Sequence, residues 1–163
     1  MLLWMDKGQP VPWSTGSAKA HLDEAHPSGI LPLAVWCQFG QLPPELAMLD
    51  TGSEYSVIGS EQIELLGHAL GEPLEPRTLS SRRGRFKGAL HRLTVHLIAH
   101  QGKGLTIDTT VGAYPGWTGP SVLGFRGFLE HFRLALEPGD RDTPTRIHFG
   151  GYQGSTSFDG RRR

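Results

Sequence analysis

The sequence contains very little cysteine, has no excess of either charge and lacks a long apolar run. Cys37 is the only cysteine in 163 residues, so an internal disulfide is excluded and a reducing compartment is expected. Sixteen basic and sixteen acidic residues cancel, which argues against binding of nucleic acid or anionic membrane through overall charge. No run reaches the ~18 apolar residues of a membrane span, and the N-terminus lacks a signal-peptide pattern. We therefore expect a soluble, cytoplasmic protein.

Glycine and proline, in contrast, are frequent. The 22 glycines and 12 prolines fall between short apolar runs, which is typical of many short strands joined by turns. Apolar and polar residues alternate from 93 to 99, which predicts the second strand of a hairpin over 74–99. Ser60 is expected to cap a short helix that ends at Gly67. The other predicted strands are 30–39, 46–50, 55–59, 105–113, 121–124, 133–137 and 145–151, with a helical turn at 128–132. The fold class is therefore mostly β.

The length favours one domain with a single core. Residues 1–28 show no sustained periodicity and are predicted to form a partly ordered N-terminal arm or leader. Residues 29–151 form the predicted domain, and residues 152–163 a disordered basic tail. Cys37 lies in the apolar run LAVWCQF without a basic neighbour, so we expect it to be buried rather than catalytic.

One stretch, AMLDTGSEYSVI, places a carboxylate directly after an apolar strand. Asp50 followed by Thr51 and Gly52 is, on its own, usually a capped turn. A second block, Val122, Leu123 and Gly124, lies far downstream and precedes a short helical segment. Both a turn cap and a catalytic carboxylate stay open on the first block alone, and the second block favours catalysis.

Together, the Asp-Thr-Gly-Ser block, the downstream Val-Leu-Gly block and the hairpin between them resemble the retropepsin-like aspartic proteases, and most of all their bacterial branch. The resemblance covers about residues 30–137. It implies a small closed β-barrel with a flap hairpin and one or two short helices, one lobe per chain. It also implies an aspartic endopeptidase that needs no metal or other cofactor.

The chemistry of such an enzyme requires two carboxylates. One acts as a base on water and the other protonates the substrate carbonyl. They share a proton because two carboxyl groups in contact do not both ionise easily. This chain has a single Asp-Thr-Gly, since Asp108 is followed by two threonines inside a predicted strand. The resemblance therefore implies a homodimer in which each chain supplies one Asp50.

The resemblance also assigns roles around Asp50. Thr51 would hydrogen-bond across the twofold axis, and Gly52 would let the backbone approach the carboxylate. Ser53 would donate a hydrogen bond to the carboxylate. Without a dimer, Thr51 and Ser53 are ordinary turn residues.

Glu54 and Arg126 are the predicted ion pair near the site. In retroviral members an acid at the position of Glu54 pairs with an arginine directly after the downstream glycine. Arg126 follows Gly124 by two residues instead of one, so the spacing departs from that pattern.

The segment SSRRGRF occupies the place of the flap, a hairpin tip that closes over bound peptide. Its candidate residues are Arg82, Arg83, Gly84, Arg85 and Phe86. Phe86 would pack on substrate, and the arginines would select acidic substrates or hold the lid open by repulsion. A solvated basic loop explains them equally well, and contact with nucleic acid is a third reading.

Two further functions stay open beside the protease. The first is a non-catalytic member of the fold that binds extended peptide as an added strand. The second is a nucleic-acid-binding module that uses the arginine tip. His96 and His100 lie on the same face of a predicted strand, but no third ligand has matching spacing, so no metal site is predicted.

Overall fold

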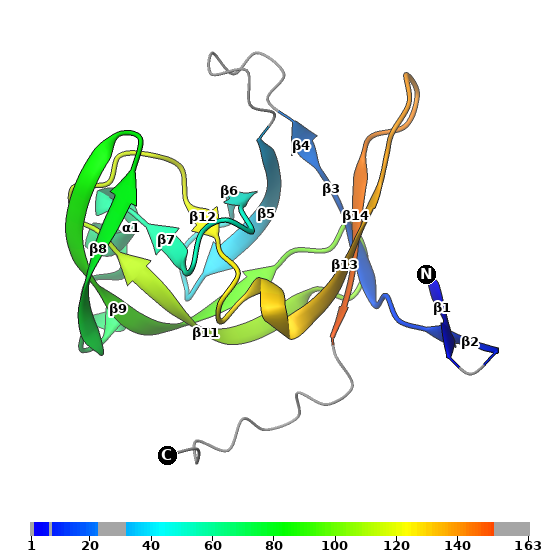
Figure 1. The fold of residues 1–163 in the computed structure, drawn as a ribbon, viewed down its shortest axis with the longest axis horizontal. Coiled ribbons are helices and arrows are strands. Elements are labelled where there is room, and N and C mark those ends of the chain that lie inside the picture. Colours follow the sequence, from blue (N-terminus) through cyan, green and yellow to red (C-terminus); the bar gives the residue numbers. More distant parts are fainter. Residues whose placement is uncertain (1, 7, 23–31, 152–163) are drawn as a thin grey trace.

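The computed structural model describes residues 2–6, 8–22 and 32–151. Its centre is a closed barrel of six strands, because β9 pairs with β11 on one side and with β5 on the other. Around the barrel, the strands follow the order β5 (Leu33–Phe39), β6 (Glu45–Leu49), β12 (Val122–Leu123), β7 (Ser56–Ile58), β11 (Leu105–Ala113) and β9 (Gly84–Leu97). The predicted mostly β fold with a small closed barrel is confirmed (Figure 1).

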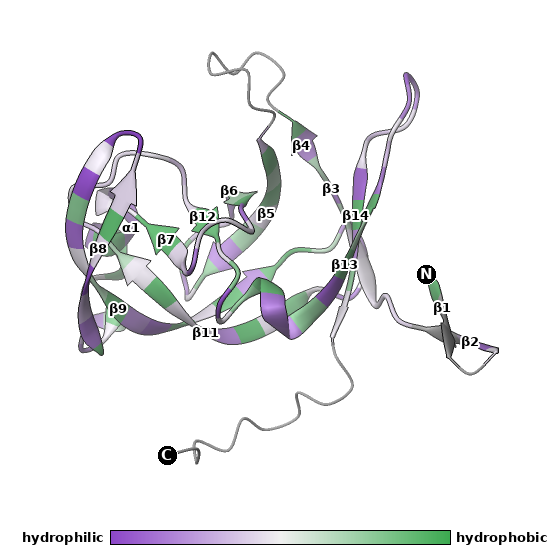
Figure 2. Ribbon diagram, in the orientation of Figure 1, coloured by the Kyte–Doolittle hydropathy of each residue, from purple (hydrophilic) through white to green (hydrophobic). Residues whose placement is uncertain are grey.

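The barrel interior is filled by alternate residues of its strands. The exposed fraction is 0% for Val35, Cys37 and Phe39 of β5. On β9, it is 0% for Val95 and 1% for Leu97. Figure 2 shows hydrophobic residues along β5, β7 and β12. Burial also raises the pKa of the Cys37 thiol, so Cys37 is an inert core residue, as predicted.

A second sheet stands beside the barrel. Its strand order is β10 (Gln101–Gly102), β3 (Gly16–Lys19), β14 (Arg146–Gly151) and β13 (Phe132–Glu137). In addition, β4 (His21–Leu22) pairs with β5, and β1 (Leu3–Asp6) pairs with β2 (Gln9–Pro12) as a separate hairpin. β13 and β14 form the long hairpin to the right of the barrel in Figure 1.

Residues 16–19 belong to the segment 1–28, which is predicted to form a partly ordered arm or leader, and they are a strand of this sheet. β3 lies between β10 and β14, and Ser17 and Ala18 are buried. The domain boundary at residue 29 stays a prediction. The predicted basic tail at 152–163 lies outside the described residues.

The helices are short. α1 (Ser60–Leu66) is capped by Gly59, so the predicted cap at Ser60 is wrong by one residue. The Ser60 hydroxyl donates to the carbonyl of Pro115 instead. Gly67 ends α1 as predicted, and η1 (Gly67–Leu70) continues as a 3-10 turn. η2 (Leu129–His131) is the predicted helical turn before β13. In the described part of the chain, no helix is long and apolar enough to cross a membrane.

Candidate active site

Asp50 lies in the turn between β6 and β7, and β12 runs between these two strands. The Asp50 N–H donates to the Leu123 carbonyl at 3.1 Å, so the two sequence blocks meet directly. Within the turn, the Gly52 N–H donates to Asp50 Oδ1 at 2.9 Å and the Ser53 N–H to the Asp50 carbonyl at 3.2 Å. Asp50 is half-buried. Backbone donors therefore fix both the position and the orientation of this carboxylate.

Gly124 sits where two segments cross at close range. A Cβ at this position would lie 2.3 Å from the backbone carbon and oxygen of Tyr55. The Gly124 N–H donates to Ser56 Oγ at 3.1 Å, and the Phe125 N–H donates to the Ser53 carbonyl at 2.9 Å. The downstream apolar-Gly block is thus a backbone clamp on the carboxylate turn, and glycine is required there because no side chain fits.

Ser53 does not support Asp50 in the predicted way. Its hydroxyl donates to the Tyr55 carbonyl at 2.8 Å, and a hydroxyl has only one proton to donate. The expected donation from Ser53 to the carboxylate is therefore wrong for this chain, and Gly52 supplies a donor instead. Thr51 is exposed, and its expected bond across a twofold axis stays a prediction.

The predicted pair of Glu54 and Arg126 is present. Arg126 Nε lies 3.8 Å from Glu54 Oε1, with the side chains 64% and 52% exposed, respectively. The stronger link is in the backbone, because the Arg126 N–H donates to the Glu54 carbonyl at 2.7 Å. An ion pair this exposed contributes about 0 to 1 kcal/mol.

A pocket of about 440 Å³ opens above the carboxylate turn. We call the side formed by β6, the Asp50 turn, β7 and β12 the pocket floor. It presents Asp50 together with apolar side chains of Met48, Val57 and Val122. The other side is lined by residues 77–81 of β8 (Glu75–Ser81), and we call the hairpin formed by β8 and the start of β9 the hairpin roof.

The hairpin roof ends in the predicted tip. Ser81 pairs with Gly84, so Arg82 and Arg83 form the two-residue turn and Gly84 is the first residue of β9. Figure 2 shows hydrophilic residues at this tip. Arg82, Arg83 and Arg85 are exposed and do not line the pocket. The hairpin is therefore where the sequence placed it, but its arginines lie outside the cavity.

Trp117, which sequence reasoning left without a role, anchors the tip. The Phe86 ring meets the Trp117 ring edge-on with 5.4 Å between centroids, and the Arg83 guanidinium lies 5.9 Å from that ring. Phe86 thus packs within its own chain. The sequence signal that could have identified Trp117 is its position as a large aromatic residue in the Pro- and Gly-rich loop YPGWTGP.

Arg77, Tyr55 and Tyr114 are further pocket residues that the sequence did not single out. The Arg77 guanidinium lies 5.7 Å from the Tyr55 ring centroid, and its Nε donates to Glu75 Oε1 at 2.8 Å. Burial raises the pKa of Tyr114, so this phenol stays neutral at physiological pH. The pocket wall therefore combines one cation with aromatic surface.

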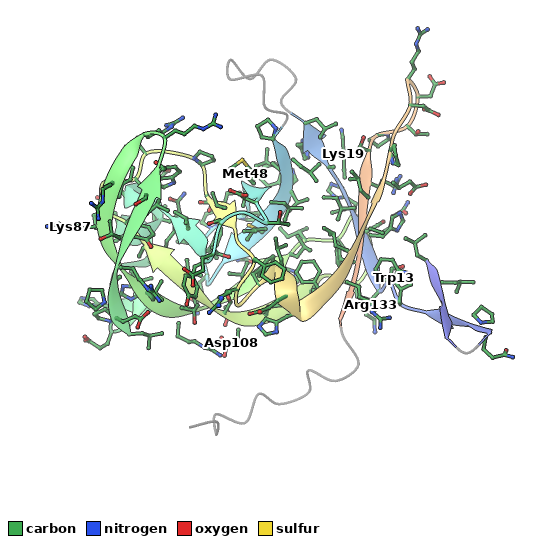
Figure 3. All side chains as sticks on the ribbon, in the orientation of Figure 1. Trp13, Lys19, Met48, Lys87, Asp108 and Arg133 are labelled. Atoms are coloured by element: carbon green, nitrogen blue, oxygen red, sulfur yellow. The ribbon has the colours of Figure 1, made fainter. Side chains whose placement is uncertain are left out.

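Asp108 does not line this pocket. It lies on the outside of the barrel on β11 (Figure 3), where it accepts a hydrogen bond from Thr94 Oγ1 at 3.1 Å. His96 contacts Thr106 Oγ1, and His100 accepts from the Lys19 N–H. Among the residues that the structure describes, no three His, Cys, Asp or Glu side chains gather as metal ligands.

This arrangement, a closed six-stranded barrel whose Asp-Thr-Gly turn is clamped by an apolar-Gly strand, is the fold of the retropepsin-like aspartic proteases. The structure is similar to that of a retropepsin-like aspartic protease from Rickettsia conorii, with a TM-score of 0.53 and 19% identity over 87% of this chain and 99% of that one. The EIAV protease in complex with the inhibitor HBY-793 matches with a TM-score of 0.44 and 18% identity over 56% of this chain and 80% of that one. No protein-family model and no curated protein matches the sequence. The resemblance drawn from the sequence is thus confirmed for the fold.

Proposed function

We propose that this chain is one half of an aspartic endopeptidase, and that two copies bring their Asp50 carboxylates together. The observation that carries the proposal is the half-buried Asp50, oriented by the Gly52 N–H at the floor of a pocket of about 440 Å³. The retropepsin-like fold supports it. A single chain offers the pocket only one carboxylate among its described residues apart from Glu54, which is paired with Arg126.

The reaction follows from two carboxylates that share one proton. The ionised carboxylate takes a proton from water while the water oxygen attacks the peptide carbonyl carbon. The other carboxyl group gives its proton to the carbonyl oxygen. The tetrahedral intermediate then collapses: the C–N bond breaks, the nitrogen leaves with a proton from the pair, and one hydroxyl group of the intermediate returns a proton to the pair as the carbonyl re-forms. Because the two groups interact strongly, they titrate as a unit.

The other pocket residues bind and enclose the substrate. Met48, Val57 and Val122 offer apolar contact to a substrate side chain. The outer edge of β8 is the end of the barrel sheet, so an extended peptide can add to it as a further strand. The hairpin roof then covers the peptide and excludes water from the carboxylates.

The test is cleavage of an unfolded protein by purified protein. Wild type should cut it, and a peptide carrying a hydroxyl that imitates the tetrahedral intermediate should inhibit the cleavage. Asp50→Asn should abolish the activity, because an amide cannot act as the base. Asp108→Asn is the matched control and should keep it. Cleavage that survives Asp50→Asn would overturn the proposal.

Peptide binding without turnover is the second candidate, and the open edge of β8 above the pocket favours it. It predicts that unfolded peptide binds wild type and Asp50→Asn with equal affinity and that neither protein cuts it. Turnover by wild type excludes this candidate.

A further inference from the structure

Arg77 is the one basic residue among the described residues that line the pocket. The acidic residues there are Asp50 and Glu54, and Glu54 has its own cation in Arg126. The arginines of the hairpin tip do not line the pocket, so a preference for acidic substrates does not follow from them. Arg77, which the sequence did not single out, is therefore the cation that a peptide in the pocket meets.

The strand pairing turns Arg77 toward the interior of the pocket. Residues two apart on a strand share a face, so Arg77 lies on the same face of β8 as Leu79, which packs on the apolar cluster around Tyr114. Gly88 of β9 lies opposite Arg77, and a Cβ at Gly88 would lie 2.5 Å from Cδ1 of Tyr114. The face of the hairpin that carries Arg77 is therefore the face that Tyr114 covers.

Lys87 is a cation on the other face of the same hairpin. It lies opposite Thr78, the neighbour of Arg77, and successive residues of a strand point to opposite faces. Lys87 is exposed, and Figure 3 shows it at the outer side of the hairpin. Arg77 and Lys87 thus differ in the face that they occupy, which makes Lys87 a matched control for Arg77.

Two contacts orient the Arg77 guanidinium. Its Nε donates to Glu75 Oε1 at 2.8 Å, and its Cζ lies 5.7 Å from the centroid of the Tyr55 ring. Glu75 is 51% exposed, so water competes for this carboxylate and the pair leaves the cation able to bind another acid. The other N–H groups are on the two terminal nitrogens, whose spacing matches the two oxygens of a carboxylate.

We propose that Arg77 binds an acidic side chain of the peptide that occupies the pocket, and that the preferred substrates therefore carry Asp or Glu at this position. The inference rests on the proposed function, which makes an extended peptide the occupant. Because the chain itself orients the guanidinium before any peptide binds, little conformational freedom is lost when the carboxylate docks. The Arg77 side chain is 43% exposed, so a peptide can reach it without displacing a strand.

The acidic residue is expected away from the scissile bond. Asp50 acts on the scissile bond, and a second carboxylate beside Asp50 would be repelled. Arg77 instead lies over Tyr55, which follows Glu54 on the chain and leads into β7. The Arg77 site is therefore a specificity site of the peptide groove and takes no part in the chemical step.

An inward charge on a last strand can also serve the fold. β8 is the last strand of the barrel sheet, and an inward-pointing charge is one way in which proteins keep an edge strand from pairing with another chain. That role predicts that Arg77→Gln causes self-association and leaves peptide preference unchanged. The solution mass, measured beside the peptide affinity, separates the two roles.

Binding is measured with full-length Asp50→Asn protein, so that no peptide is cut during the measurement. One set of fluorescent peptides with an apolar host sequence carries Asp at each position in turn, and a second set carries Asn at the same positions. At one position, the Asp peptide should bind about tenfold more tightly than its Asn counterpart, as read by fluorescence anisotropy. Equal affinity at every position, or no binding of any peptide, would overturn the proposal.

Substitutions in the same Asp50→Asn protein assign the preference to one side chain. Arg77→Gln should make the affinities of the Asp and Asn peptides equal. Arg77→Glu should reverse the preference, so that a Lys peptide binds more tightly than the Asp peptide at that position. Lys87→Gln removes a charge from the outer face of the hairpin and should keep the full preference. A preference that survives Arg77→Gln, or that Lys87→Gln abolishes equally, would contradict the role of Arg77.

Turnover separates this inference from the proposed function. Wild type should cleave the Asp peptide with a KM about tenfold lower than that of the Asn peptide and with similar kcat, because Arg77 does not contact the reacting groups. Tighter binding of the Asp peptide without any cleavage by wild type keeps the inference and removes the protease. Cleavage and binding that do not distinguish Asp from Asn remove the inference and keep the protease.

Discussion

The pocket floor and the hairpin roof face the same cavity but are held in different ways. The floor is fixed by backbone hydrogen bonds between segments distant in sequence, such as Asp50 to Leu123 and Phe125 to Ser53. Its strands β7 and β12 are buried throughout. The roof is mostly exposed along β8, and its tip is held by the contacts of Phe86 and Arg83 with Trp117.

This difference indicates that the hairpin roof, rather than the pocket floor, can move. Backbone bonds in a buried crossing have no alternative partners, so the floor holds its geometry unless the fold opens. A few aromatic and cation contacts at an exposed tip can break and re-form locally. Changes in the floor should therefore cost stability, and changes in the roof should act mainly on substrate binding.

The largest effect on stability is expected for Gly124→Ala in the floor. The new methyl group would lie 2.3 Å from the Tyr55 backbone, which cannot withdraw without breaking the clamp. The free energy of unfolding should fall by about 3 kcal/mol, measured by urea denaturation. Gly151→Ala is the control, since the nearest atom to its Cβ is Leu105 Cδ1 at 3.8 Å. Equal stability of the two variants would contradict a rigid floor.

A smaller loss is expected for Phe86→Ala in the roof. The half-buried ring packs on Trp117 and on the small cluster around Val57 and Val122. Its removal should lower the free energy of unfolding by about 1 to 2 kcal/mol and raise KM more than it lowers kcat. Lys87→Ala, at the exposed neighbouring position, should leave the free energy of unfolding, KM and kcat unchanged. A pure loss of kcat would show that the roof acts on the chemical step.

Arg126→Ala should have a weaker effect still. Its ion pair with Glu54 is exposed, and the backbone bond from the Arg126 N–H survives the substitution. A double-mutant cycle with Glu54→Gln should give a coupling energy of about 1 kcal/mol or less. A coupling well above that value would mean that the ion pair, rather than the backbone, holds this part of the floor.

A similarly small effect on stability is expected for Arg83→Gln at the tip. It removes the cation from the Trp117 ring, a contact that contributes about 0.5 to 1 kcal/mol at an exposed site. The loosened tip should raise KM slightly, while Arg82→Gln, its partner in the turn, should leave KM unchanged. The same effect from both substitutions would indicate that charge alone, and not the contact with Trp117, controls the roof.

Local sequence patterns predicted much of this architecture. The alternation in 93–99 and the turn at SSRRGRF gave the hairpin, because strand period and turn chemistry are properties of neighbouring residues. The two blocks around Asp50 and Gly124 gave the floor, since apolar strands ending on Asp and Gly are rare in combination. Their contact through Leu123 follows from the fold they share.

The missed features depend on contacts between distant segments. β3 is rich in small residues, Gly16, Ser17 and Ala18, and has no apolar alternation, so its burial between β10 and β14 left no periodic signal. The Ser53 hydroxyl donates to the Tyr55 carbonyl because the backbone path of the turn brings these two groups together. Trp117 contacts Phe86 because β11 and β9 pair as far as Ala113 opposite Ala89, which brings the loop after β11 to the start of β9.

The central claim, that each chain supplies half of the catalytic site, is tested most directly by mixing. Wild type and Asp50→Asn are combined in equal amounts, allowed to exchange subunits, and assayed for cleavage at a fixed total concentration. If activity requires two Asp50 residues, mixed dimers are inactive, and about one quarter of the wild-type activity should remain. If each chain works alone, about one half should remain, and that result would contradict the account.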